Sequence, residues 1–213
     1  MNEISKSRIA KFFAEYDGLK YLEQNITDAI RLIVSCAQKN KVLLCGNGGS
    51  AADCGHIAGE LLKSFALARR IPDALKERLE SAYGFDGSSI AESVQQGVMC
   101  IPLTSFEAFN TAFLNDCNEK MLFAQLVNVL GSDGDILMAI STSGNSKNVC
   151  YAAQLARVKG LKIISLTGGS GGKLKELSDI LINVPGETVY KIQEFHLPVY
   201  HLICLCVESE LFE

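Results

Sequence analysis

The chain has 213 residues, of which 48% are hydrophobic and 21% are charged, and its formal net charge at pH 7 is −4. This length suits one α/β domain with a well-filled core and is too short for two domains of ordinary size. The acidic balance disfavours nucleic acid as a partner. We expect no membrane association, because no apolar run reaches the length of a membrane span and residues 1–6 lack the apolar core of a signal peptide.

The cysteines indicate a cytoplasmic protein. There are eight, and no two of them form a C-x-x-C pair. Buried, reduced thiols explain their placement better than a secreted disulfide framework does. Five of them lie in apolar segments: Cys45, Cys100, Cys150, Cys204 and Cys206.

The first part of the chain predicts helices and then a strand. In residues 1–40, two helices are expected from about Ser5 to Asn40. We interpret them as helices that serve packing or subunit contact rather than chemistry. Val42–Cys45 is a short apolar strand. It ends in the turn Gly46–Ser50, which opens a helix that continues to about Phe65.

Residues 66–97 interrupt this pattern and predict a helical insertion. Asp73–Tyr83 has the pattern of a short amphipathic helix, glycines and serines in 84–89 predict a turn, and Ile90–Gln96 is weakly helical. Two interpretations stay open. The insertion is either a lid over the site or a surface hairpin without a role in the chemistry.

The rest of the chain alternates strands with helices. Continuously apolar strands in such an alternation indicate a parallel sheet covered on both faces, a three-layer αβα sandwich in one domain of residues 1–213. Residues 104–116 form a loop or a helical segment. Strands are expected at Val98–Leu103, Asp135–Ile140, Leu161–Leu166 and Ile180–Val184, and helices at about Glu119–Leu130, Lys147–Lys159 and in the C-terminal residues 189–213, from about Val189 to Leu211.

Three loops that follow strands carry turn and hydroxyl residues: Gly46–Ser50, Ser141–Ser146 and Thr167–Gly172. In an open parallel sheet such loops share the carboxyl edge, where ligands bind. Glycine amides and a helix N-terminus favour an anion there. The second loop adds four hydroxyls, which favour phosphate binding over ordinary N-capping. The hydroxyls belong to Ser141, Thr142, Ser143 and Ser146.

Only two helices carry histidines. Asp53, His56 and Glu60 lie along one face of the helix that follows the first strand, and the i, i+4 spacing of the last two lets them share a metal or a substrate. On its own this spacing more often reflects a solvated pair. The C-terminal helix carries His196 and His201.

Gln193 and His201 lie eight residues apart on roughly one side of the C-terminal helix, which separates their backbones by about 12 Å. The two side chains can therefore contact one ligand only if they approach it from opposite sides or if the helix is bent between them. Pro198 between them is a candidate for such a bend, because proline removes an i→i−4 hydrogen bond.

Together these motifs resemble the sugar isomerase (SIS) fold, and within it the phosphoheptose isomerases. The resemblance covers about Lys41 to Phe65 and about Phe113 to the C-terminus, and it implies a five-stranded parallel sheet in flavodoxin-like order. It does not extend to the insertion. The matching stretches are Cys45–Asp53 with His56 and Glu60, Ile140–Ser146, Leu166–Gly168 with Gly171–Lys173, and Ile192–Glu194 with His201.

The resemblance implies a role for each matching residue. Glu60 and His201 would be the acid–base pair of a ketose–aldose isomerisation. A zinc ion would be held by His56, Glu60, Gln193 and His201. The sugar phosphate would contact Asn47, Gly48, Gly49, Glu60, Asn115, Asp116, Ser141, Thr142, Ser143, Ser146 and Gln193.

The implied activity is the interconversion of sedoheptulose 7-phosphate and D-glycero-D-manno-heptose 7-phosphate through an enediol, by a cytoplasmic homotetramer that supplies heptose for surface polysaccharide. The alternatives are an isomerase of another sugar phosphate and a non-catalytic SIS-fold adaptor of replication initiation. The adaptors lack the terminal histidine, so Glu60 and His201 favour an enzyme. A sugar-phosphate-sensing regulator is disfavoured, since the chain has no room for its DNA-binding domain.

Overall fold

The computed structural model describes residues 1–213, and its centre is a sheet of five parallel strands in the order β2-β1-β3-β4-β5. This confirms the flavodoxin-like order, which reverses between β1 and β3, the point where such sheets bind ligands. Val42 of β1 lies between Cys100 and Ile136. The strands are β1 (Val42–Cys45), β2 (Cys100–Pro102), β3 (Ile136–Ile140), β4 (Lys162–Gly168) and β5 (Ile180–Val184).

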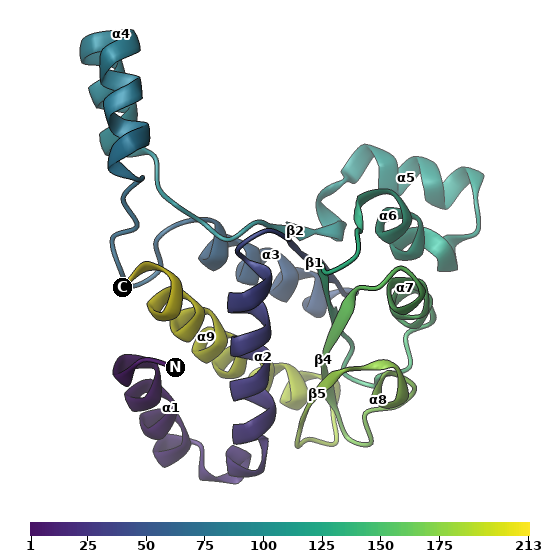
Figure 1. Ribbon diagram of the computed structural model, residues 1–213. Coiled ribbons are helices and arrows are strands. Elements are labelled where there is room, and N and C mark those ends of the chain that lie inside the picture. Colours follow the sequence, from purple (N-terminus) through teal and green to yellow (C-terminus); the bar gives the residue numbers. More distant parts are fainter.

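Helices cover both faces of the sheet, as the continuous apolar strands predict. On one face lie α1, α2, α3 and α9, and on the other lie α6, α7 and α8, with α5 beside α6 (Figure 1). The helices are α1 (Glu3–Glu15), α2 (Glu23–Cys36), α3 (Gly49–Leu62), α4 (Asp73–Ser93), α5 (Glu107–Asp116), α6 (Leu122–Leu130), α7 (Lys147–Val158), α8 (Leu174–Leu177) and α9 (Val189–Phe212).

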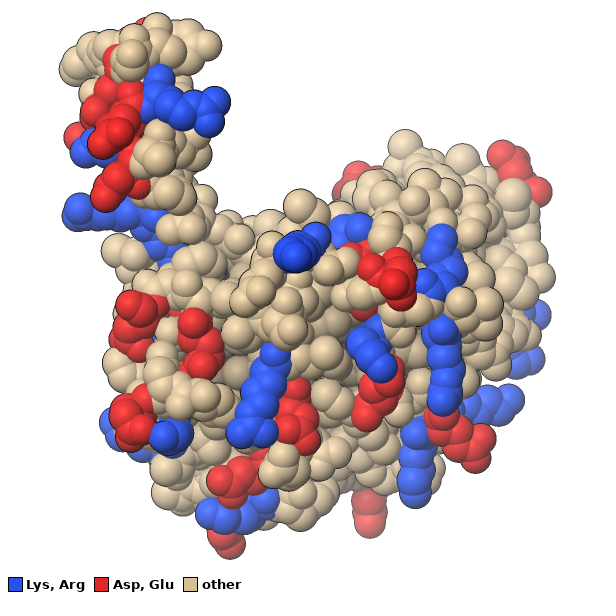
Figure 2. Space-filling model, in the orientation of Figure 1, with Lys and Arg blue, Asp and Glu red and all other residues tan.

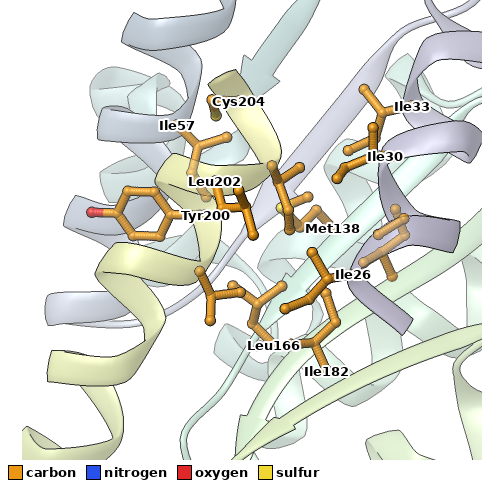
Figure 3. Packing of buried hydrophobic residues seen from close by; sticks show 14 of the residues in the cluster. Ile26, Ile30, Ile33, Ile57, Met138, Leu166, Ile182, Tyr200, Leu202 and Cys204 are labelled. Atoms are coloured by element: carbon orange, nitrogen blue, oxygen red, sulfur yellow. The ribbon is translucent and has the colours of Figure 1, made fainter. Parts of the chain in front are cut away.

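Each face of the sheet has its own apolar core. Successive strand residues point to opposite faces, so Leu44 packs in the core on the side of α2 and α9 while Leu43 packs in the core on the side of α7. Figure 3 shows the larger of the two, in which Ile30 of α2 and Leu202 of α9 meet Met138 of β3. The site described below therefore stands on a sheet buried on both sides.

The C-terminal helix α9 is the central helix of the larger core. It packs against α1, α2 and α3, and it continues through Pro198 from Val189 to Phe212, so proline does not divide it. α9 is also long and apolar enough to span a membrane, contrary to the expectation that no stretch reaches that length. However, 56% of its most apolar window is buried inside the fold, which marks it as a core helix.

The insertion forms a protruding arm, α4 with its two connections. The chain reverses at Gly84, whose φ of +54° breaks the helix, and the two halves then pack so closely that a Cβ on Gly87 would strike the Leu79 carbonyl. The predicted turn at 84–89 is therefore too long, since residues 87–89 are helical. The arm stands clear of the body (Figure 1), and the lid interpretation remains a prediction.

Two other boundaries differ from the predicted ones, and one segment with two predicted alternatives is decided. α3 ends at Leu62 rather than Phe65, because Lys63 adopts an extended conformation. β2 contains only Cys100–Pro102, and proline at its end cannot donate to a ladder. Residues 107–116, predicted as loop or helix, form α5.

Candidate active site

The first loop of the site is the turn between β1 and α3. Gly48 has a φ of +54°, which glycine adopts without strain, and a Cβ on Gly46 would meet the Ser50 carbonyl oxygen at 2.8 Å. The backbone amides of Gly48 and Gly49 donate to no acceptor within the chain. They lie at the N-terminus of α3, where the helix dipole favours an anion.

The second loop joins β3 to α7. Ser146 occupies the N-cap of α7 but makes no capping bond, and its Oγ lies 3.0 Å from Ser141 Oγ. Ordinary capping therefore does not explain Ser146. The amides of Ser146 and Lys147 also lack an acceptor within the chain. The two loops are tied together, because the side-chain amides of Asn47 and Asn148 bond reciprocally at 2.9 and 2.8 Å.

Between the two loops lies a pocket of about 270 Å³, next to a second hollow of about 340 Å³. Thr142 lines both, while Ser143 lines only the second. A larger cavity of about 350 Å³ at the base of the arm holds no predicted site residue, so we place the site where the two helix N-termini converge. The pocket is lined by Asn47, Gly48, Gly49, Ser50, Ile140, Ser141, Thr142, Ser146, Val189 and Gln193.

Three residues of the predicted sugar-phosphate contacts lie outside the pocket: Glu60, which belongs to the cluster described next, and Asn115 and Asp116. Asn115 and Asp116 are exposed at the end of α5, where Asn115 Nδ2 donates to Asp116 Oδ1 at 2.7 Å. Neither lines the pocket or its neighbouring hollow. The structure thus brings most of the predicted contacts together around the two loops and leaves Glu60, Asn115 and Asp116 outside the pocket.

The predicted acid–base cluster, which consists of His56, Glu60 and His201, lies further along α3 and α9. His56 Nε2 is 3.3 Å from Glu60 Oε1 and 3.5 Å from His201 Nε2. The imidazole rings of His56 and His201 pack edge to face, and their centroids are 4.9 Å apart. Glu60 Oε2 is buried without a hydrogen-bond partner, and the Lys63 ammonium lies 3.7 Å from it as an ion-pair neighbour. This oxygen therefore keeps its hydrogen-bonding capacity for a proton or a cation.

Two further residues lie beneath this cluster. His56 Nδ1 is 2.9 Å from the hydroxyl of Tyr200, which donates to Asp53 Oδ1 at 3.4 Å. The helical spacing of Asp53 and His56 along α3 is visible in the sequence. The sequence does not predict a role for Tyr200, because a tyrosine in an apolar helix is typical of a core residue. Its position next to His201 is the only signal in the sequence.

The surroundings shift the pKa values of this group. Burial raises the pKa of Asp53, although the Tyr200 hydrogen bond and the neighbouring His56 oppose the shift. Burial and the nearby His56 lower the pKa of His201, with Glu60 opposing them. His201 therefore tends to be neutral near pH 7, which suits a side chain that both accepts and donates a proton.

The side chains of His56, Glu60 and His201 are of the chemical types that bind zinc. Two imidazole nitrogens and a carboxylate are ligands that zinc prefers, and ligand atoms of a tetrahedral zinc lie about 3.4 Å from one another. The spacings from His56 to Glu60 and to His201 are close to that value. As the chain stands, however, no three His, Cys, Asp or Glu side chains are grouped as a finished metal site.

Gln193, the fourth predicted ligand, lines the pocket between the two loops. Its side chain lies over Gly49, where an added Cβ would meet it. α3 and α9 pack side by side, so Gly49 meets Gln193 at one level and His56 meets His201 about two turns further along. The two helices thus link the pocket to the acid–base cluster.

The third histidine belongs to the core. His196 is fully buried and its Nε2 donates to the Thr167 carbonyl at 3.2 Å, while its Nδ1 has no partner. Burial lowers the pKa of His196 to about 4 despite that hydrogen bond. It is held neutral and contributes no ligand to the site.

Comparison with known proteins identifies the family of this chain. Residues 111–202 match the SIS domain family. The chain is 39% identical to a phosphoheptose isomerase of Burkholderia pseudomallei over 189 residues (89% of this chain, 82% of the relative) and 34% identical to one of Helicobacter pylori over 206 residues (96% and 94%).

Two solved structures have the same fold. The phosphoheptose isomerase of Neisseria gonorrhoeae is 32% identical with a TM-score of 0.73, covering 96% of this chain and 98% of its own. That of Francisella tularensis is 30% identical with a TM-score of 0.75, covering 98% and 100%. Sequence and fold agree over nearly the whole length, and the chain belongs to the phosphoheptose isomerase family.

Proposed function

We propose that this chain interconverts sedoheptulose 7-phosphate and D-glycero-D-manno-heptose 7-phosphate through an enediol. The observation that carries the proposal is the pairing of two sites along α3 and α9. A pocket with two helix N-termini suits the phosphate, and the Glu60–His201 cluster suits the carbonyl end of the sugar. The family relationship, with relatives named phosphoheptose isomerase, supports the same substrate class.

In the proposed reaction, Glu60 removes a proton from C1 of the ketose and returns it to C2, which yields the aldose. His201 moves a proton between the oxygens on C2 and C1, so that the enediol forms and collapses without net gain of a proton. The neutral state that burial favours for His201 lets it act in both directions. Glu60 Oε2, which is buried without a hydrogen-bond partner and lies 3.7 Å from the Lys63 ammonium, provides the basic atom.

For the metal, we propose that zinc is held by His56, Glu60 and His201, with Gln193 as a further ligand. When bound, zinc would polarise the sugar carbonyl. The support is the donor chemistry and the spacing of His56 Nε2, which lies 3.3 Å from Glu60 Oε1 and 3.5 Å from His201 Nε2. Zinc content of protein purified without chelator, compared with His201→Ala, tests this; equal zinc content in both proteins excludes His201 as a ligand.

We further propose a cytoplasmic homotetramer that supplies heptose for surface polysaccharide. The cysteines support the location, because none forms a disulfide and seven are buried. Exposed aromatic side chains on the arm, Tyr83 and Phe85, support contact between copies. Light scattering should give four times the chain mass of 23.1 kDa, and the mass of a single chain would contradict the tetramer.

Substrate identity is tested by a panel of five- to seven-carbon ketose phosphates with product analysis. We expect the highest kcat/KM for sedoheptulose 7-phosphate. Faster turnover of a shorter ketose phosphate would favour the alternative, an isomerase of another sugar phosphate. No turnover of any member would favour the non-catalytic adaptor.

A further inference from the structure

The tyrosine beneath the acid–base cluster is placed as a support for His56. Tyr200 is only 1% exposed and lies on α9 directly before His201. Its ring packs edge to face against both imidazoles. The centroid distance and interplanar angle are 5.5 Å and 75° to the His56 ring, and 5.0 Å and 86° to the His201 ring. One side chain of α9 therefore packs against both imidazoles.

Its single hydroxyl proton determines the direction of the hydrogen bonds. An ionised Asp53 can only accept, so Tyr200 donates its proton to Asp53 Oδ1. The hydroxyl oxygen, 2.9 Å from His56 Nδ1, can then only accept from that nitrogen. The proton of a neutral His56 consequently resides on Nδ1, which leaves a lone pair on Nε2.

We propose that Tyr200, held by Asp53, is a positioning residue that fixes His56 as its Nδ1–H tautomer and aims the Nε2 lone pair at the space between Glu60 and His201. Nε2 lies 3.3 Å from Glu60 Oε1 and 3.5 Å from His201 Nε2. The inference deepens the proposed function, because this lone pair is the one a zinc ion would use. Hydrogen-bond partners of ligating histidines commonly set the tautomer in this way.

The competing arrangement is specific. If His56 carried its proton on Nε2, that nitrogen would donate to Glu60, and Nδ1 would accept from Tyr200. His56 could then ligate no metal at Nε2 without first losing that proton. The two arrangements differ in which ring nitrogen bears hydrogen, and this difference can be observed without any metal.

The test is Tyr200→Phe, which keeps the ring and removes only the hydroxyl. The matched control is Tyr190→Phe, an exposed tyrosine on the same helix. In metal-free protein, ¹⁵N NMR of the histidines, assigned with His56→Gln, should show His56 as Nδ1–H in wild type and in the control. Tyr200→Phe should shift His56 toward Nε2–H. Zinc affinity, measured by chelator competition, should fall 10- to 100-fold in Tyr200→Phe alone.

Two results overturn the proposal: a wild-type His56 protonated at Nε2, or a Tyr200→Phe variant whose His56 tautomer matches wild type. An unchanged zinc affinity in that variant also counts against it. Failure of the proposed function gives a different signature. Wild-type protein that neither binds zinc nor isomerises a heptose phosphate would contradict that function, while the tautomer measurement on metal-free protein would still decide the role of Tyr200.

Discussion

Ser146 is the residue at which the proposed phosphate binding can be separated from catalysis. It stands at the N-cap of α7 without capping the helix, and its hydroxyl lies 3.0 Å from that of Ser141, beside which it lines the pocket. Ser146→Ala should raise KM for the sugar phosphate about 10- to 100-fold and leave kcat within a few-fold, because a hydrogen bond to a charged group contributes about 1.5–3 kcal/mol of uniform binding. Steady-state kinetics measures both constants.

The control for Ser146 is Ser81→Ala, an exposed serine on the arm. It should leave both constants unchanged. If Ser146→Ala also leaves KM unchanged, the phosphate does not bind between these loops.

His196 makes stability depend on pH. Its pKa is about 4 in the folded chain and 6.5 when unperturbed, so the unfolded chain binds more protons between these values and stability falls as pH decreases through that window. The loss by pH 4 is about 3 kcal/mol. His196→Gln retains a donor for the Thr167 carbonyl and removes the titration. Urea unfolding at pH 7 and pH 5 should show a smaller loss in this variant than in wild type, and equal losses would contradict this account.

Single residues were predictable from the sequence where a periodic helix fixed their spacing. His56 and Glu60 share one face of α3, and the structure confirms their contact. Tyr200 was not predictable, because its contact with His56 depends on how α9 packs against α3 rather than on either sequence alone. The position of Asn115 was not predictable either, because it depends on where α5 packs. α5 has no buried residue, and Asn115 does not line the pocket.

At the level of elements, the apolar strands followed from the sequence, since buried parallel strands form continuous apolar runs. Their order was implied by the resemblance to the SIS fold. The helical insertion was predicted as well, but the extent of its turn was wrong. Glycines normally indicate a turn, but only Gly84 adopts a positive φ, and Gly87 serves close packing between two helices instead. Sequence alone does not distinguish these two uses of glycine.

A buried ion pair between Arg69 and Glu208 fixes the C-terminal end of α3. Arg69 donates through its guanidinium to the carbonyls of Leu61 and Glu60 and to Glu208 Oε1, at 2.8–2.9 Å. Glu208 on α9 also accepts the backbone amides of Phe65 and Ala66, both at 2.8 Å. Burial alone would raise the pKa of Glu208, but these hydrogen bonds outweigh it and lower the pKa. The pair thus anchors the chain between α3 and the arm.

Glu208→Gln leaves Arg69 as an unpaired buried charge, which costs about 3–5 kcal/mol in the free energy of unfolding. Urea denaturation should show this loss. Glu194→Gln breaks only the exposed pair with Lys191 on the same helix and should cost at most about 1 kcal/mol. Similar losses in the two variants would mean that the buried pair has no special role.

For the molecule as a whole, the arm is separable from the fold. None of its residues belongs to either core, charged side chains of both signs cover it (Figure 2), and its two connections meet where Gln96 N donates to the Arg69 carbonyl at 2.8 Å. Replacing residues 71–94 by a two-residue Asn-Gly turn should therefore give a folded protein whose Tm lies within about 5 °C of wild type.

Loss of cooperative unfolding in this deletion variant would show that the arm supports the domain. Its apparent KM separates the two interpretations of the insertion. A raised KM for the sugar phosphate favours a lid, and an unchanged KM favours a surface hairpin.

The most direct test of the proposed isomerase is the turnover of sedoheptulose 7-phosphate by wild type and by Glu60→Gln, measured side by side. The amide keeps the shape of the carboxylate and cannot accept the C1 proton, so kcat should fall about 10²- to 10⁴-fold while phosphate binding and melting temperature are retained. A Glu60→Gln protein that turns the substrate over at nearly the wild-type rate would contradict the assignment of Glu60 as the base.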